Sequence, residues 1–364
     1  MNKLKINIIG SIFGTTGYDS HTRNLFNALY KIADVKLSVP LKPEWQRFVN
    51  DAELDAITKP TRNEDINLIV TTPHNWKLCL GLGTNIGYCV WEGDKIPKSY
   101  IEEILNPKIN LVFAPSEHTR KAIENTFGEK YNLIENKIKI IPHGVNRDIF
   151  YKTNKPKTND KFIFLVVKGW RGTNWDRGGV QYVIKAFAEE FKKVENVQLE
   201  IKLNSAYINQ QILQQAIENL NLPTDRPPIH VCIDNTPFDK LNNIYNDANV
   251  FICATRAESF NLPGIEAMAC GLPTIQTNFG GQTDYMTKEN SLFIDYELSE
   301  SEEKPMYENI NWATPKIESL KKQMRWAFEN QDKIQEMGQQ ALEDSKNWTW
   351  DCSVQKIVDV INHI

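Results

Sequence analysis

Short and almost uniformly apolar runs recur along the chain, and stretches with helical periodicity lie between them. Such runs suit the strands of a parallel sheet, because helices cover both faces of that sheet and bury every side chain. The runs predict strands at 5–9, 35–39, 66–72, 86–90, 109–114, 137–141, 162–167, 197–203, 230–233, 250–254 and 273–277. This alternation of strand and helix predicts the α/β fold class.

A polar stretch at 151–161, rich in Lys, Asn, Thr and Pro, interrupts the alternation and indicates an interdomain linker. The 364 residues are also too many for one compact core and suit two domains. We therefore predict one Rossmann-like domain over 1–150 and a second over 151–345. The final segment, 346–364, has the apolar spacing of an amphipathic helix.

Local signals also predict where the helices begin and end. Asp19 or Ser20 suits the N-cap of the first helix, because short polar side chains bond to the free amides there. Apolar residues recur at helical spacing over 180–194 and mark a long amphipathic helix. The residues 316–342 are helical in pattern as well.

Composition excludes several classes of protein. A net charge of −4 at pH 7 provides no field that would recruit nucleic acid. No apolar stretch reaches the roughly 20 residues that span a bilayer, and the first residues lack the apolar core of a signal peptide. The six cysteines form no C-x-x-C pair, so neither zinc nor a disulfide framework is expected. We expect a cytoplasmic protein, whose slightly basic first 150 residues permit peripheral contact with the inner membrane face.

The densest signal is the segment 257–273, which reads A-E-S-F-N-L-P-G-I-E-A-M-A-C-G-L-P. It follows the apolar run at 250–254, and Pro263 suits the first turn of a new helix. Main-chain amides at the start of that helix are free donors and can bind an anion. Glu258 lies before the helix and Glu266 about one turn inside it, so both can border the bound anion.

Two carboxylates beside a bound diphosphate would have separate tasks, because neither should bind phosphate directly. One would accept hydrogen bonds from a ribose diol, and the other from hydroxyl groups of a sugar. The alternative is a capped surface helix with solvated glutamates, which is the favoured interpretation for the two glutamates alone. When the complete loop and the nearby cations are considered together, an anion-binding site becomes the favoured interpretation.

The segment resembles the E-x₇-E motif of family 4 retaining glycosyltransferases, commonly written E-G-F-G-L-P-x-x-E-A-M-A-C-G-x-P. The matching positions are Glu258, Phe260, Leu262, Pro263 and 266–271. Ser259 and Asn261 replace the usual glycines. The resemblance implies a GT-B fold, in which two Rossmann-like domains face each other across a cleft and a C-terminal helix crosses back to the first domain.

The resemblance also implies a reaction. A hexose-type sugar would pass from a nucleotide-diphosphate-sugar, UDP- or GDP-linked, to a hydroxyl group of a glycan, glycolipid or similar acceptor. The anomeric configuration would be retained by front-face displacement, in which the leaving phosphate takes the proton. No metal or other cofactor is expected beside the donor.

In the family a basic pair lies on the first strand–helix crossover of the second domain, where an Arg is followed by a Lys before a Gly. Here Lys168 occupies the place of that Arg, although Arg171 could serve, and Arg177 occupies the place of the Lys. Two cations there would neutralise the leaving diphosphate, on which negative charge develops. Exposed loop cations are the alternative interpretation.

Two further segments resemble the family. The residues 279–284 match its G-G-x-x-E turn, with Asp284 in place of Glu, and 140–146 match the I-P-x-G-V-D segment that closes the first domain. In the first domain, the resemblance implies that a glycine loop containing Gly14 and Gly17 faces the donor. That loop lacks the G-x-G-x-x-G spacing of dinucleotide binders, so it indicates little by itself.

His74 lies just past an apolar run, at the sheet edge where open α/β folds bind ligands. Related enzymes often place a histidine there, near the acceptor, and an ordinary loop histidine is the alternative. Asn204 lies at a strand end where a nucleotide base could sit. The predicted catalytic residues are thus Glu258, Lys168, Arg177 and His74, and the predicted donor contacts are Glu266, Ser259, Phe260, Asn261, Leu262, Arg171, Gly14, Gly17 and Asn204.

Three other functions fit part of the pattern. A nucleotide-sugar 2-epimerase shares the fold, but the pair Glu258 and Glu266 disfavours it. A nucleotide-dependent dehydrogenase is disfavoured by the missing glycine fingerprint. An inactive sugar-nucleotide sensor would keep the site but tolerate the loss of Glu258 and Arg177.

Overall fold

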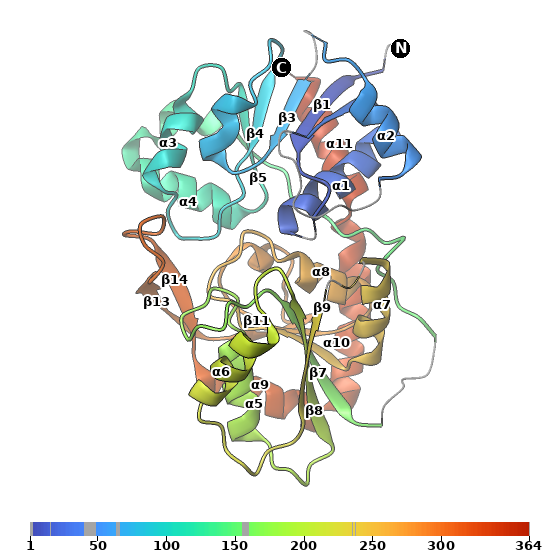
Figure 1. Cartoon of the computed structure of the whole chain (residues 1–364), viewed down its shortest axis with the longest axis vertical. Helices are drawn as coiled ribbons and strands as arrows, with labels where there is room; N and C mark the ends of the chain where they lie inside the picture. The colour runs from blue at the N-terminus through green and yellow to red at the C-terminus, as the bar shows by residue number, and fades with distance from the viewer. Residues whose placement is uncertain are drawn as a thin grey trace. The chain divides into compact units, whose positions relative to one another are not determined.

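The computed structural model describes residues 3–14, 16–39, 49–62, 66–154, 160–234, 236 and 238–363. The chain divides into two compact units: unit 1 comprises Met1–Gly144 and Thr349–Ile364, and unit 2 comprises Val145–Trp348 (Figure 1). The domain boundaries predicted from the sequence, after residues 150 and 345, lie a few residues from these. The middle of the predicted linker, 155–159, lies outside the described residues.

Unit 1 contains a parallel sheet with the strand order β2-β1-β3-β4-β5-β6. The strands are β1 (Lys5–Gly10), β2 (Asp34–Ser38), β3 (Ile66–Val70), β4 (Asn85–Tyr88), β5 (Leu111–Ala114) and β6 (Ile138–Ile140). The α-helices are α1 (Gly17–Tyr30), α2 (Asp51–Thr58), α3 (Lys98–Leu105), α4 (Glu117–Phe127) and α11 (Trp350–Ile361), and the 3₁₀ helices are η1 (Pro73–Leu78), η2 (Gly128–Leu133) and η3 (Glu135–Lys137). The strand order reverses between β1 and β3, and open α/β sheets bind ligands at such a point.

Unit 2 contains a second parallel sheet, with the order β12-β11-β10-β7-β8-β9. Its strands are β7 (Phe162–Lys168), β8 (Val197–Asn204), β9 (Ile229–Asp234), β10 (Val250–Cys253), β11 (Thr274–Thr277) and β12 (Ser291–Ile294). Its helices are α5 (Val180–Glu190), α6 (Gln210–Asn219), α7 (Phe238–Asp247), α8 (Leu262–Ala269), η4 (Gly281–Asp284), α9 (Ile317–Glu329), α10 (Gln331–Asp344) and η5 (Ser345–Asn347). The strand order reverses between β7 and β10, as in Rossmann folds.

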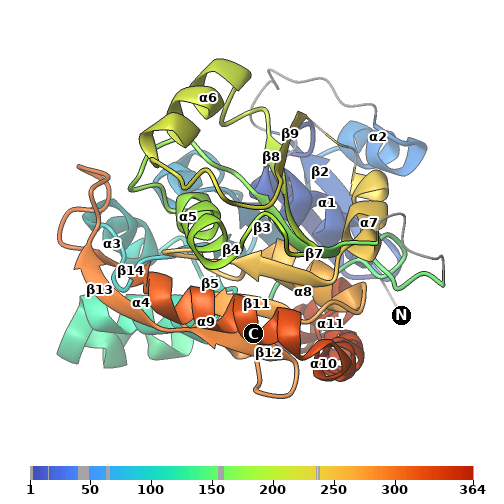
Figure 2. The same ribbon diagram turned by 90° about the horizontal axis from the view of Figure 1, so that it is seen from below.

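An antiparallel pair of strands, β13 (Tyr296–Glu300) and β14 (Asn311–Pro315), follows β12 and is not part of the parallel sheet. We call residues 296–315 the arm. Figures 1 and 2 both place it on the side of unit 2 opposite α7. This element is not among the predicted strands.

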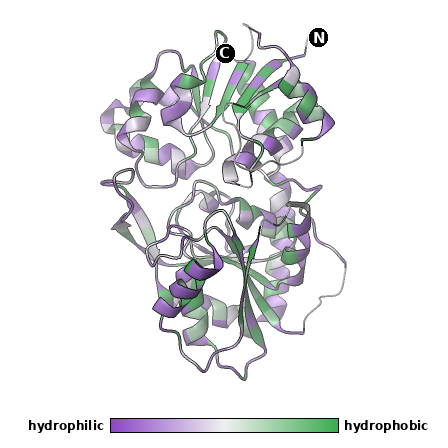
Figure 3. Cartoon of the chain, viewed as in Figure 1, coloured by the Kyte–Doolittle hydropathy of each residue, from purple (hydrophilic) through white to green (hydrophobic). Residues whose placement is uncertain are grey.

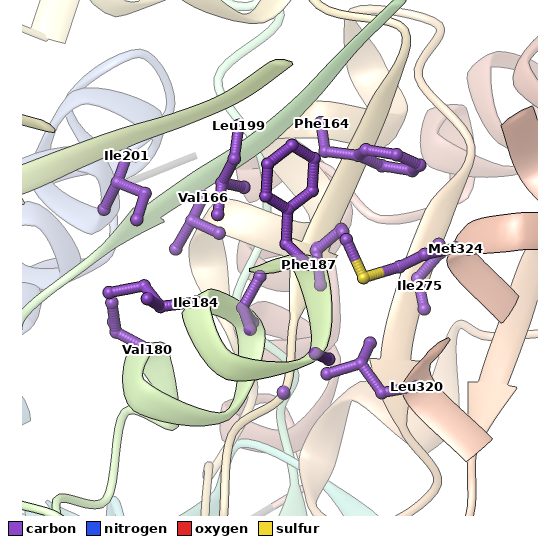
Figure 4. Close-up of a cluster of buried hydrophobic side chains, with 14 of the residues drawn as sticks. Phe164, Val166, Val180, Ile184, Phe187, Leu199, Ile201, Ile275, Leu320 and Met324 are labelled. Carbon is purple, nitrogen blue, oxygen red and sulfur yellow. The ribbon is translucent and has the colours of Figure 1, made fainter. Parts of the chain in front are cut away.

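The core of unit 2 explains why its central strands β7 and β10 are almost continuously apolar. Phe164 and Val166 of β7 face one layer, where they meet Phe187 of α5 and Met324 of α9 (Figure 4). Leu165 faces the opposite layer, which contains side chains from α7, α8 and α10. Both faces of the sheet are therefore buried at β7 and β10, whereas every second residue of the edge strand β9 is exposed. The strands of the parallel sheets stand out as apolar in Figure 3.

The first helix begins earlier than predicted. Thr16 is its N-cap, and Asp19 is the third residue inside the helix rather than the cap. The Thr16 side chain accepts a hydrogen bond from the Asp19 amide, and the Asp19 carboxylate accepts one from the Thr16 amide at 3.1 Å. This reciprocal capping box satisfies two free donors at once, so it outcompetes a cap on Asp19 or Ser20.

Two other helix boundaries correct the predictions. The predicted helix over 180–194 ends at Glu190, because Phe191 is already extended and the side chain of Val194 is 92% exposed. The pattern over 316–342 is divided into α9 and α10 by Asn330, which has φ −120° and ψ 52°. The Asn330 side chain donates to the Trp326 carbonyl at 2.8 Å and so competes with the helical bonds there.

The C-terminal segment returns to unit 1, as predicted for the terminal helix. Within that unit α11 packs against α1, and Asp351 forms an exposed ion pair with Lys31 at 3.1 Å. Among the helices of the described residues, none combines the length and the apolar character that crossing a bilayer requires.

Candidate active site

The candidate site lies in unit 2 at the carboxyl ends of β7 and β10, which are neighbours in the sheet. Lys168 is the last residue of β7, and the loop 254–261 joins β10 to α8. Because parallel strands end at the same edge, the sheet brings together residues that are far apart in the sequence. This is the point at which the strand order reverses, where a ligand site is expected.

Lys168 and Glu258 form an ion pair at this edge, and their side chains are only 9% and 15% exposed. The Lys168 ammonium also donates to the Asn261 amide oxygen at 3.4 Å. Burial lowers the pKa of Lys168, but interactions with Cys253 and Glu258 outweigh burial, and the net shift of the pKa is upward. Lys168 therefore stays charged, and it joins two residues of the predicted motif.

Asn261 explains one departure from the family pattern, which has glycine at this position. Its backbone is left-handed, with φ 67°, and asparagine is among the few residues other than glycine that adopt this conformation readily. The side chain is buried and donates to the Gln276 amide oxygen at 2.6 Å, while the Tyr285 hydroxyl donates to the Asn261 carbonyl at 3.0 Å. Asn261 thus keeps the turn, and its side chain adds the bonds with Gln276 and Lys168, which glycine could not make.

The glycine turn predicted from the resemblance supports the same loop. The Gly281 amide donates to the Glu258 carbonyl at 2.8 Å. A Cβ atom at Gly281 would lie 1.8 Å from the Ser259 carbonyl oxygen, so only glycine fits. The turn therefore packs directly against the segment that carries Glu258.

Arg177 reaches the same place from the loop between β7 and α5. Its guanidinium donates to the Ala257 carbonyl at 3.3 Å, next to Glu258. The two loops meet closely, because Gly179, at φ +74°, lies where a Cβ atom would be 1.8 Å from the Ala254 carbonyl oxygen. The structure thus brings Lys168, Arg177 and Glu258 to one edge of the sheet.

Arg171 has a different partner. Its side chain is 58% exposed and forms an ion pair with Glu303 of the arm at 3.1 Å. The sequence leaves open whether Lys168 or Arg171 serves in the basic pair, and in this structure it is Lys168 that pairs with Glu258.

Glu266 lies on α8 and is buried. Its described partner is the Tyr245 hydroxyl of α7, which donates to the carboxylate at 2.9 Å. Burial raises the pKa of Glu266 to about 7, although the hydrogen bond from Tyr245 works in the opposite direction. The two motif carboxylates therefore have different surroundings, since Glu258 pairs with a cation and Glu266 with a neutral hydroxyl.

The remaining predicted residues of unit 2 have more local contacts. Phe260 is buried, and its ring packs 5.4 Å from that of Tyr285 and 6.0 Å from that of Trp348. Ser259 is buried and Leu262 is half-buried at the start of α8. Asn204 ends β8, where its side chain accepts a bond from the Ala206 amide at 2.9 Å.

The predicted residues of unit 1 lie at the carboxyl edge of that unit's own sheet. His74 is exposed in η1, after β3, and its Nε2 lies 3.3 Å from the Thr72 hydroxyl. The Gly14 amide donates to the Asp19 carboxylate at 2.9 Å. A Cβ atom at Gly17 would meet nothing within 4 Å among the described residues. Thr15, between these glycines, lies outside the described residues.

Sequence reasoning missed two residues that shape these loops. Asp176 is buried, and its carboxylate accepts bonds from the amides of Arg171 at 3.1 Å and Gly178 at 2.7 Å. Arg256 is also buried, although arginine is seldom fully buried. In the sequence, the only signal for Asp176 was its place beside Arg177, and no signal pointed to Arg256.

The described residues contain no group of three or more His, Cys, Asp or Glu side chains that could hold a metal ion.

Comparison with known proteins agrees with this picture. The residues 167–303, which include Lys168, Arg177 and Glu258, match the family described as Glycosyl transferases group 1. A probable sucrose-phosphate synthase from Thermosipho melanesiensis is 28% identical over 211 residues, which is 52% of this chain and 47% of that protein. A D-inositol 3-phosphate glycosyltransferase from Paenarthrobacter aurescens is 26% identical over 179 residues, 44% of this chain and 41% of that one. The chain thus spans less than half the length of these relatives.

Solved structures share the fold over nearly the whole chain. A glycosyltransferase from Rickettsia africae superposes with a TM-score of 0.71 at 15% identity, covering 99% of this chain and 98% of that one. HepE from Anabaena in complex with UDP-glucose gives a TM-score of 0.69 at 13% identity, covering 99% and 100%. The predicted class of fold is confirmed: the chain has two Rossmann-like α/β units of the GT-B type, and the match to the glycosyltransferase family lies within the second unit.

Proposed function

We propose that this chain transfers a hexose-type sugar from a UDP-linked donor to a hydroxyl acceptor, with retention of the anomeric configuration and without a metal ion. The observation that carries the proposal is the group Lys168, Arg177 and Glu258 at the switch point between β7 and β10. It lies inside the stretch that matches the glycosyltransferase family. UDP is preferred over GDP because the similar HepE structure holds UDP-glucose.

In the proposed reaction, the acceptor hydroxyl attacks the anomeric carbon on the face from which the diphosphate leaves. The bond between that carbon and the β-phosphate oxygen breaks, the new glycosidic bond forms, and the acceptor proton passes to the departing phosphate. Lys168 and Arg177 neutralise the charge that grows on this phosphate. Lys168 is already charged before a donor arrives, and Glu258 and Asn261 hold it at this edge of the sheet.

The two motif glutamates have distinct tasks in this proposal. Glu258, beside the cations, accepts hydrogen bonds from the hydroxyl groups of the donor sugar, and Glu266 accepts them from the ribose. The partners of the two carboxylates support this division. Glu258 forms an ion pair with Lys168, whereas Glu266 accepts a hydrogen bond from the Tyr245 hydroxyl. His74 and the loop with Gly14 and Gly17 remain candidates for contact with the sugar and acceptor.

The test is transfer by the purified chain. UDP-, GDP- and ADP-sugars are each incubated with a panel of saccharide and glycolipid acceptors, and release of the nucleoside diphosphate is followed together with the product's anomeric configuration. We expect release from a UDP-sugar, dependence on an acceptor, a retained configuration and full activity in EDTA. An inverted product, or activity that EDTA abolishes and Mg²⁺ restores, contradicts the proposal. An epimerised donor in the absence of acceptor would make the chain an epimerase.

A further inference from the structure

Arg256 connects three segments of unit 2, and it lies in the loop that leads to Glu258. Its side chain is 1% exposed. The guanidinium donates to the Trp175 carbonyl at 2.8 Å and to the Glu302 carboxylate at 2.8 Å, and a further bond reaches the Ser299 hydroxyl at 3.2 Å. Trp175 belongs to the loop between β7 and α5, whereas the other two partners belong to the arm.

The main chain of Arg256 joins the same loop and the arm by two further hydrogen bonds. The Arg256 amide donates to the Arg177 carbonyl at 2.9 Å, and the Arg256 carbonyl accepts a bond from the Ala313 amide at 2.8 Å. The guanidinium also lies 5.4 Å from the ring centre of Trp312, where a cation is attracted by the aromatic face. One residue thus holds the arm to the loop that carries Arg177 and to its own loop.

The arm begins at the functional edge of the sheet. It follows β12 immediately, and β12 runs parallel to β11 and β10, so the arm leaves from the edge at which Lys168 and Glu258 lie. A second ionic link, between Arg171 and Glu303, joins the arm to the loop after β7 at 3.1 Å. The arm therefore flanks the candidate site and is tied to both of its loops.

We propose that Arg256 is a positioning residue that clamps the arm against these two loops and thereby sets the affinity of the site for a nucleoside diphosphate. The inference rests on the proposed function. Arg256 is too buried to touch a ligand, so its side chain acts through the loop that carries Arg177, which it holds at the Trp175 carbonyl. One nitrogen of the guanidinium bonds the Trp175 carbonyl and the Glu302 carboxylate, and the other reaches the Ser299 hydroxyl. Lysine has a single nitrogen and cannot occupy both positions of this fork.

The test must separate position from charge, because any buried cation near the site would attract a diphosphate. The probe is UDP, and its dissociation constant is measured by calorimetry for the unsubstituted chain, Arg256→Lys and Glu302→Gln. If Arg256 acts by position, we expect Arg256→Lys to weaken UDP binding by about tenfold, the loss of one bond to a charged group, although the charge is kept. Glu302→Gln should weaken UDP binding by about threefold, although this substitution makes the region more positive.

Attraction by charge alone gives the opposite result and overturns the inference. In that case Arg256→Lys binds UDP as the unsubstituted chain does, and Glu302→Gln binds it more tightly. The matched control is Glu297→Gln, on the same arm but 74% exposed at its ion pair with Lys316, and we expect a change of less than about twofold. General loss of folded protein would lower the bound fraction without changing the dissociation constant.

Hydrogen exchange provides a measurement that does not depend on the ligand. We expect the Ala313 amide and the arm strands to exchange at least several times faster in Arg256→Lys than in Glu297→Gln. If UDP does not bind to the unsubstituted chain, the proposed donor is wrong, and this measurement decides the inference alone. Equal exchange in the two variants would then show that Arg256 does not clamp the arm.

Discussion

Unit 1 and unit 2 both reverse their strand order beside their first strand, but the loops at these two places use their charges differently. In unit 1 the buried Asp19 carboxylate accepts bonds from the Ser11 hydroxyl at 2.5 Å and the Gly14 amide at 2.9 Å. The Arg23 guanidinium donates to the Ile12 carbonyl at 2.8 Å. Arg23 also forms an ion pair with Glu53 of α2 at 3.4 Å, and both side chains are largely buried.

In unit 2 the charges at the edge face each other. Lys168 pairs with Glu258, and Arg177 lies on the adjoining loop. A ligand with its own negative charge can compete for Lys168 at the end of β7, whereas Arg23 is held by both the Ile12 carbonyl and the buried Glu53. Under the proposed function, unit 2 is therefore the side that binds the diphosphate of the donor.

The largest expected effect comes from breaking the charged pair. Lys168→Met and Glu258→Gln should each lower the rate of sugar transfer by about 100- to 1000-fold, the usual cost of one preorganised contact to developing charge. Initial rates at saturating donor check this. The matched control is Lys185→Met, in an exposed pair with Glu189 on α5, which should leave the rate unchanged. If the Lys168→Met variant stays active, Lys168 is not needed for transfer, and the charged pair would no longer distinguish unit 2 from unit 1.

The same pair makes a prediction for stability. Lys168→Met removes the cation beside a largely buried Glu258, so we expect the free energy of unfolding to fall by about 3 kcal/mol. The double variant Lys168→Met/Glu258→Gln should regain most of that loss, because no charge is then left without its counterpart, but it should stay inactive. Urea unfolding of the three chains gives the comparison, and additive losses would contradict it.

Two glycines sharpen the contrast between the units. Alanine at Gly179 would need φ +74° and would put its Cβ atom 1.8 Å from the Ala254 carbonyl oxygen, so Gly179→Ala should cost at least about 2 kcal/mol. Gly17→Ala meets open space at the start of α1 and should be neutral or stabilising by up to about 1 kcal/mol. Thermal unfolding measures both. If Gly17→Ala keeps its stability but loses transfer, Gly17 contacts the ligand; unchanged transfer removes it from the candidates.

The pH dependence of stability should reveal Glu266. Its pKa is about 7 in the folded chain against 4.5 for the free group, so the folded state holds a proton that the unfolded state has lost. Stability should therefore fall as the pH rises from 4.5 to 7, by about 1 kcal/mol per pH unit, and level off above 7. Glu266→Gln cannot lose a proton and should lack this part of the slope. Parallel curves for the two chains in urea would show that Glu266 is not buried as described.

The smallest effect is expected in unit 1. Asp19→Asn removes the carboxylate from the capping box of α1, which should cost about 1 kcal/mol. Hydrogen exchange over 11–14 and at Thr16 should become faster, while UDP affinity changes little because the proposed anion site lies in unit 2. A large loss of UDP affinity in this variant would overturn the assignment of the two units.

Much of this protein is determined by short-range sequence patterns. Apolar runs predicted the parallel strands other than β12, because the strands of a sheet covered on both faces bury most of their side chains. Pro263 and the motif around it predicted the short helix α8, and α8 does begin at Leu262 and end at Ala269. Such signals are local, since a cap or a helical period needs only neighbours within a turn or two.

Only the tertiary structure decided which distant charges meet. Lys168 pairs with Glu258 because β10 lies beside β7 in the sheet, and nothing in the local sequence sets that order. Arg171 is directed to Glu303 by the arm, an element absent from the predicted strands. The burial of Arg256 likewise depends on the arm covering it. A side chain's partner is a property of the completed packing, so residues close in sequence to a motif can lie outside the site that the motif builds.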